Sequence, residues 1–168
     1  MDTSQITEIV KKVIRQQGSV DGAGVSKKGD IQDMSLDIAM TIARGVEKRA
    51  RDIGVKAVVA ITNRGANPVL VHCMDDSFIA SYDVALGKAY TVVALKMSTG
   101  KLKSLAQPGG SLYGIQNTNN GRIVIFGGGE PLMLRGCLIG GLGVSGGTEE
   151  EDTALAEYGK QLFESLSV

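Results

Sequence analysis

The sequence has 168 residues, of which 43% are hydrophobic and 21% charged, and it fits one globular domain. Eighteen basic residues balance eighteen acidic ones, which argues against a nucleic-acid partner because such binding needs a basic surface. No stretch reaches the roughly 18 apolar residues of a transmembrane helix, so no membrane partner is expected. The chain has one histidine and two cysteines, and their spacing is not that of a zinc site. Two cysteines without a disulfide framework fit a protein of the reducing cytoplasm.

Residues 1–16 predict an amphipathic helix. Five branched apolar side chains recur at intervals of three and four residues, which places them on one helix face. They are Ile6, Ile9, Val10, Val13 and Ile14. So short a helix is only marginally stable in water, so this face needs a surface on its own domain or on a partner. Residues 17–32, rich in glycine and small polar residues, predict a flexible linker.

The middle of the chain predicts two helices and a hairpin between them. A helix is expected over 33–53, and the β-branched run 55–61 with the stretch 68–74 predicts a β-hairpin. A long helix over 77–97 follows, and a short one over 98–106.

The second half is rich in glycine. Residues 121–126 predict a strand, 127–131 a tight loop and 132–146 a second hairpin, before a helix over 148–166. Paired strands with short turns indicate an antiparallel sheet with helices packed on it, which is an α+β domain. No glycine-rich phosphate motif opens a helix, which excludes a Rossmann fold.

Three stretches of the chain resemble one family. Residues 68–77, 81–95 and 127–152 are similar, in this order, to the strand, helix and glycine-rich ending of the GlcG/HbpS family. Residues 112–131 resemble the branch found as the C-terminal domain of PduO-type cobalamin adenosyltransferases. The resemblance assigns residues 33–168 to a GlcG/HbpS-like domain. It implies a profilin-like five-stranded antiparallel sheet flanked by helices, homo-oligomers, haem binding and a cobalamin-linked role.

The N-terminal helix also has a counterpart. Residues 1–16 resemble the encapsulation peptides of bacterial microcompartment enzymes, which dock onto shell or cargo proteins. The two resemblances imply a diol- or glycerol-type microcompartment, whose lumen would be the location of this protein. The apolar face of the helix would then bind a shell or cargo partner. Packing on its own domain, or within an oligomer, stays open.

The single imidazole is a candidate metal ligand. His72 is the only histidine in the chain and so the only strong nitrogen ligand for haem iron. Strand alternation puts Pro68, Leu70 and His72 on one face, which could meet a helix, an interface or solvent. A structural role stays open. The cobalamin-linked branch can supply a histidine in the helix at 33–53, and its absence here argues against haem binding.

A second set of candidates lies on the long helix and in the glycine loop. Asp83 and Lys88 sit in an otherwise apolar helix with Thr91 near Lys88, and such charges need an ion pair or a pocket edge. The loop offers consecutive backbone N–H groups that could bind an anion, or simply make a turn. Its candidate residues are Gly127, Gly128, Gly129 and Glu130. By resemblance, Lys88 and this loop line a concave site near a subunit boundary.

Together these features predict a small-molecule-binding protein, with haem or a corrinoid as the ligand, inside a microcompartment. One alternative is a structural assembly protein that links cargo to shell through its N-terminal helices. Another is an enzyme acting on a small metabolite through Asp83, Lys88 and the glycine loop.

Overall fold

The computed structural model describes residues 33–166, so the expected helix at 1–16 and the linker at 17–32 lie outside the described residues. The described part carries four α-helices, four strands and two short 3-10 turns. In chain order they are α2 (Leu36–Asp52), β1 (Val58–Asn63), β2 (Pro68–Cys73), α3 (Ile79–Leu95), α4 (Thr99–Leu105), η1 (Ile115–Asn117), η2 (Asn119–Gly121), β3 (Gly129–Leu134), β4 (Cys137–Ser145) and α5 (Glu149–Leu166).

The strands form one antiparallel sheet in the order β2-β1-β4-β3. Both expected hairpins are present, because β1 pairs with β2 and β3 pairs with β4. The two hairpins join through β1 and β4, where Val59 lies opposite Val144. On its other side Val59 lies opposite His72. The predicted α+β class and antiparallel sheet are therefore confirmed.

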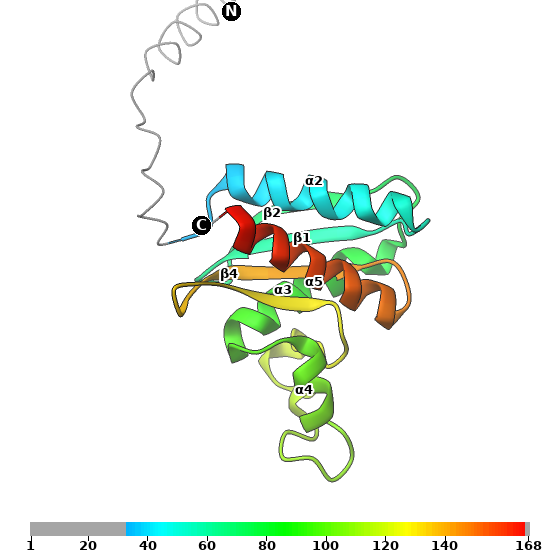
Figure 1. Ribbon diagram of the computed structural model, residues 1–168. Coiled ribbons are helices and arrows are strands. Elements are labelled where there is room, and N and C mark those ends of the chain that lie inside the picture. The colour runs from blue at the N-terminus through cyan, green and yellow to red at the C-terminus, as the bar shows by residue number, and fades with distance from the viewer. Residues whose placement is uncertain (1–32, 167–168) are drawn as a thin grey trace, which may run out of the picture. The chain divides into compact units, whose positions relative to one another are not determined.

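Helices cover both faces of the sheet. Figure 1 shows α2 and α5 on one face and α3 on the other. Val59 and Ile61 of β1 pack in the core under α2 and α5, whereas Val58 and Ala60 pack with α3. Successive strand residues point to opposite faces, so a central strand covered on both sides is apolar along its length. None of the helices in residues 33–166 is long and apolar enough to cross a membrane.

Two glycines of β4 allow α3 to lie close to the sheet. A Cβ at Gly141 would overlap the carbonyl oxygen of Ala89, and one at Gly143 would overlap that of Ala85. Any larger residue at these positions would push the helix away from the strand. The glycines of this region therefore serve packing rather than only turns.

The expected strand at 121–126 is wrong. This segment has no strand pairing, and within residues 33–166 the sheet has four strands instead of five. Its apolar residues are used differently: Ile123 is buried, and the backbone N–H of Val124 donates to the Thr91 hydroxyl of α3 at 2.9 Å. The expected tight loop at 127–131 is also shorter, since β3 already begins at Gly129, which lies opposite Gly143.

Candidate functional site

A pocket of about 690 Å³ lies where α2 ends and the edge strand β2 reaches its last residues. Its walls come from the C-terminal half of α2, the start of the chain leading into β1, and the turn after β2. The residues that line it include Glu47, Arg51, Lys56, His72, Cys73, Met74 and Asp76. This volume lies within the range of about 300–1,000 Å³ that small-molecule pockets occupy.

His72 points from β2 toward α2. It shares a sheet face with Leu70, which belongs to the core under α2 and α5. Its Nδ1 lies 2.5 Å from Oε1 of Glu47, and 38% of the His72 side chain remains exposed against 16% of Glu47. Among the described residues no hydrogen bond is made by Nε2 of this ring. The imidazole is thus held at one nitrogen, and its ring lines the pocket.

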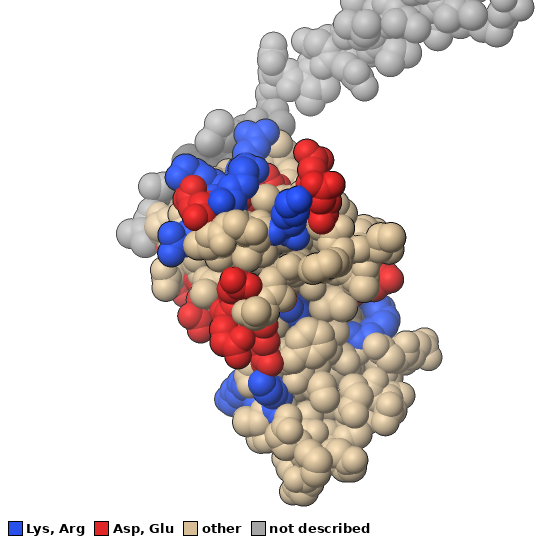
Figure 2. Space-filling model, turned by 90° about the vertical axis from the view of Figure 1, so that its right-hand side faces the viewer, with Lys and Arg blue, Asp and Glu red and all other residues tan. Residues whose placement is uncertain are grey.

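Charges of both signs surround this pocket. Lys56 Nζ lies 2.7 Å from Asp76 Oδ2, and Arg51 Nη2 lies 3.9 Å from Glu47 Oε2. The hydrogen bond and charge of Lys56 lower the pKa of the Asp76 carboxyl. Figure 2 shows basic and acidic side chains together on the face toward which α2 ends. Both cations are exposed, so an anionic group entering the pocket could exchange with their present partners at little cost.

The two sulfur atoms of the pocket are weaker metal ligands than the imidazole. Met74 Sδ accepts a hydrogen bond from the backbone N–H of Ala57 at 3.4 Å, which ties it to the fold. Cys73 is exposed and, as the neighbour of His72 on a strand, points its side chain to the opposite face. His72 is therefore the side chain of this pocket best suited to bind a metal.

Lys88 is a structural charge. Its side chain is fully buried, and its Nζ donates to the Val144 carbonyl at 2.6 Å and to Asp152 Oδ2 at 2.7 Å, below the ring of Phe126. Burial lowers the pKa of Lys88 and raises the pKa of Asp152. The sequence left two alternatives for Lys88, an ion pair or a place at a pocket edge. The structure has the ion pair, which ties α3 to the start of α5.

The glycine loop does approach Lys88, as expected, but it does not form a concave site with it. A Cβ at Gly128 would lie only 2.7 Å from Lys88 Nζ. The N–H of Gly127 donates to Glu149 Oε1 at 2.8 Å and that of Gly129 to Thr99 Oγ1 at 2.9 Å. Because these groups already have partners and Lys88 has no exposed surface, the expected anion site is replaced by internal contacts.

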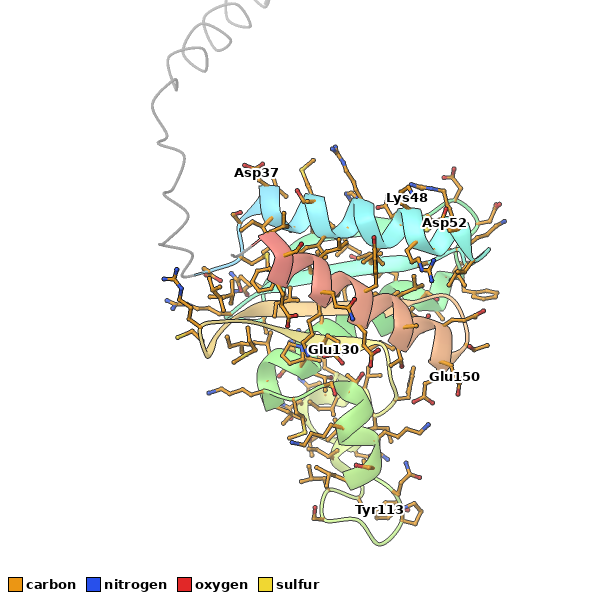
Figure 3. The ribbon with its side chains drawn as sticks, in the orientation of Figure 1. Asp37, Lys48, Asp52, Tyr113, Glu130 and Glu150 are labelled. Carbon is orange, nitrogen blue, oxygen red and sulfur yellow. The ribbon has the colours of Figure 1, made fainter. Side chains whose placement is uncertain are left out.

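Glu130 also has an internal partner. Its carboxylate lies 3.1 Å from Lys160 Nζ of α5, and Figure 3 labels Glu130 beside that helix. Burial raises the pKa of this carboxyl, and Lys160 opposes that effect. Glu130 thus fastens β3 to α5 instead of lining a ligand site.

Asp83 and Thr91 separate from Lys88. The Thr91 hydroxyl donates to the Gly87 carbonyl at 2.7 Å within α3 and accepts from Val124, so it anchors the loop after η2. Asp83 lines another pocket, of about 400 Å³, together with Arg122. Five positions along a helix turn a side chain well away from the first one, which is why Asp83 and Lys88 do not act together.

The sequence and fold of the chain are similar to those of known proteins. Residues 34–161 match the family model described as haem degrading protein HbpS-like. The chain belongs to the HbpS-like family. A member from Citrobacter freundii, an uncharacterized 15.0 kDa protein of the dhaT–dhaS intergenic region, is 44% identical over 84% of this chain and 100% of its own length. The corrinoid adenosyltransferase PduO of Citrobacter freundii is 39% identical over 69% of this chain, which spans about a third (35%) of that enzyme.

Two solved structures are similar to this chain over most of its length. The Klebsiella pneumoniae protein ORFY has 42% identity and a TM-score of 0.78, covering 83% of this chain and 96% of that one. A PduOC:heme complex has 35% identity and a TM-score of 0.75, covering 77% and 94%. The resemblance of this sequence to the GlcG/HbpS family and to the C-terminal domain of PduO is therefore confirmed.

The sequence did not predict the partners of Lys88 and His72, which are Asp152 and Glu47. Asp152 is 64 residues from Lys88, and Glu47 is 25 residues from His72. For Glu47 a local signal exists: it follows Val46 of the buried stripe of α2, and Leu70 and His72 share the strand face that this stripe covers. For Asp152 the sequence offers only an acidic first turn of α5 that contains several equivalent carboxylates.

Proposed function

We propose that this HbpS-like protein binds haem in the pocket at the end of β2, with His72 as the iron ligand. The observation that carries the proposal is the geometry of His72, whose Nδ1 is held by Glu47 while its ring, 38% exposed, lines a pocket of about 690 Å³. Imidazole nitrogen is a common protein ligand of haem iron. A relative 35% identical in sequence has been solved as a PduOC:heme complex, which supports the same ligand class here.

The residues of the pocket fit a haem group. Val55 and Met74 offer apolar surface, and Lys56 and Arg51 are cations that can meet propionate carboxylates. When bound, haem supplies a redox-active iron centre, whose chemistry belongs to the cofactor. The chain itself supplies a fixed imidazole, a partly apolar wall and two basic side chains.

The test is a haem titration of the untagged protein followed at the Soret band. We expect a saturable spectral change at micromolar haem, its loss in His72→Ala, and partial recovery of the spectrum when free imidazole is added to that variant. Cys73→Ser is the control, because it removes the neighbouring sulfur and keeps the imidazole. A wild-type protein without a saturable Soret change, or an unaltered spectrum in His72→Ala, would contradict the proposal.

A corrinoid is the second candidate ligand. The 39% identity with the corrinoid adenosyltransferase PduO supports it, although the match covers only 35% of that enzyme. The same Nε2 of His72 would then face cobalt in place of iron. A titration with aquacobalamin, followed by its visible absorption, separates the two ligands: tighter binding of the corrinoid than of haem would favour this candidate.

The location forms a further part of the proposal. We infer that residues 1–16 direct the protein to shell or cargo proteins of a diol- or glycerol-type microcompartment, because their sequence resembles encapsulation peptides. Ile9→Glu with Val13→Glu should abolish co-localisation with such proteins, since two charges would have to enter an apolar groove. A matched variant with Lys11→Glu and Lys12→Glu on the polar face should retain it. Unchanged co-localisation of the first variant would contradict the proposed targeting role of residues 1–16.

We also propose a homo-oligomer. Three large apolar side chains at the start of α3 support it, because Phe78, Ile79 and Tyr82 are 71%, 95% and 46% exposed. Neighbouring apolar residues of this size at the surface often mark an interface. Light scattering on Ile79→Glu should show a smaller particle than on the wild type, and an unchanged mass would remove this surface as the interface.

If neither haem nor a corrinoid binds, we prefer the alternative of a structural assembly protein that links cargo to shell. It needs only an oligomer that displays several N-terminal segments. The alternative of an enzyme that acts through Asp83, Lys88 and the glycine loop loses its basis. Lys88 is fully buried against Asp152, and Asp83 lines a pocket that does not include Lys88.

A further inference from the structure

The contact between α2 and the end of β2 places the carboxylate of Glu47 against the ring of His72. Glu47 Oε1 lies 2.5 Å from His72 Nδ1, and only 16% of the Glu47 side chain is exposed. The other carboxylate oxygen, Oε2, lies 3.9 Å from Arg51 on the next turn of α2. Glu47 is therefore held on both sides, by a ring on the sheet and by a cation on its own helix.

We propose that Glu47 is a positioning residue that fixes the tautomer and direction of His72, so that the unprotonated Nε2 is presented to the pocket. This inference rests on the proposed function, in which His72 binds iron. The reason is the hydrogen-bond chemistry of the pair. A carboxylate only accepts, so the nitrogen facing Glu47 must carry the proton, and a neutral imidazole then keeps its lone pair on Nε2.

A fixed tautomer has consequences for a bound metal. A carboxylate on the far nitrogen makes the imidazole a more basic ligand and prevents the ring from turning. Loss of such a partner typically lowers metal affinity by about 10–100-fold. A more basic ligand also favours the ferric over the ferrous state, so removal of Glu47 should raise the reduction potential of bound haem.

The tautomer can be observed directly without any haem. His72 is the only histidine among 168 residues, so untagged full-length protein labelled with nitrogen-15 at histidine gives a single imidazole in nuclear magnetic resonance. At alkaline pH, where an ordinary imidazole is neutral, we expect Nδ1 to carry the proton in the wild type. Glu47→Ala should lose this preference. Glu47→Gln, whose amide oxygen still accepts, should retain it.

Asp52→Ala is the matched control. Asp52 lies on the same helix and pairs at 3.5 Å with Lys48, and Figure 3 shows both on the outer side of α2. This variant removes the same charge without touching His72, so the imidazole signals should match those of the wild type. A wild-type ring protonated at Nε2, or an unchanged tautomer in Glu47→Ala, would overturn the inference.

Haem titrations of the same proteins separate this inference from the proposed function. We expect about 10–100-fold weaker haem binding in Glu47→Ala, little change in Asp52→Ala, and no further loss when Glu47→Ala is added to His72→Ala. A wild-type protein that takes up no haem would contradict the proposed function and this inference with it. Haem binding that depends on His72 but has equal affinity in Glu47→Ala would contradict the inference alone.

Discussion

Two polar side-chain pairs of the domain, Lys88 with Asp152 and His72 with Glu47, differ in what they leave accessible. The side chains of Lys88 and Asp152 are 0% and 5% exposed, whereas those of His72 and Glu47 are 38% and 16% exposed. Both pairs join a helix to another element, but Lys88 Nζ has a carboxylate and a carbonyl as partners and no surface left. The His72 ring lines a pocket. A ligand site needs a group that is held and still reachable, and only the second pair meets both conditions.

The first prediction, with the largest expected effect, concerns the buried pair. Asp152→Ala removes the carboxylate that compensates the Lys88 ammonium. We expect the free energy of unfolding to fall by about 3–5 kcal/mol, because a buried charge without its partner is left uncompensated. Urea unfolding followed by circular dichroism measures this loss.

The control for that experiment removes both charges. Lys88→Met combined with Asp152→Leu should recover most of the lost stability, since an apolar pair of similar volume often replaces a buried ion pair without loss. A cost below about 1 kcal/mol for Asp152→Ala would mean that the pair behaves like one at the surface, and the contrast between the two regions would disappear.

The second prediction concerns Glu149, which holds the glycine loop near the buried pair. The hydrogen bond from Lys103, followed by that from the Gly127 N–H, lowers the pKa of the Glu149 carboxyl. Its stabilising effect is therefore present above the ordinary pKa of glutamate and is lost as the pH falls through the folded-state value. We expect Glu149→Gln to cost about 0.5–1 kcal/mol at neutral pH and little in acid, as measured by urea unfolding at several pH values.

Glu150→Gln is the comparison variant for Glu149. It removes the same charge at the next position of α5, labelled in Figure 3, and should change stability less at neutral pH. An equal loss for Glu149→Gln in acid and at neutral pH would show that its contribution does not come from the ionised carboxylate.

The third prediction concerns the half-buried pair and has the smallest effect on stability. His72→Ala should lower the free energy of unfolding by less than about 1 kcal/mol, because a single partly exposed hydrogen bond to a carboxylate contributes little. The same variant should lose haem binding. Thermal unfolding with Asp52→Ala as the control measures the first effect, and a loss as large as that expected for Asp152→Ala would place His72 among the structural residues.

Much of the fold could be predicted from local sequence. The hairpins over 55–74 and 132–146 follow from apolar runs separated by turn residues, and the structure has both. The helix expected over 33–53 is α2, and the Ser35 hydroxyl caps it by accepting from the Ile38 N–H. The strand at 121–126 was wrong because an apolar run can bury itself against a helix as well as in a sheet, which is what Ile123 and Val124 do beside Thr91.

The candidate site was less predictable, because partners distant in sequence decide it. The identity of Lys88 indicates a charge that needs a partner, but only the packing of α5 beside α3 selects Asp152. His72 was placed correctly on the face shared with Leu70. The meeting of this face with Glu47 depends on where α2 lies over the sheet, which short-range periodicity does not determine.

The most direct test of the central claim is to identify the iron ligand. Ferric haem is added to untagged protein labelled with nitrogen-15 at histidine alone, and hyperfine electron paramagnetic resonance is recorded. Because His72 is the only histidine, this account predicts a coupling from one labelled imidazole nitrogen, absent in His72→Ala. A saturably bound haem that shows no coupling to labelled nitrogen would contradict it.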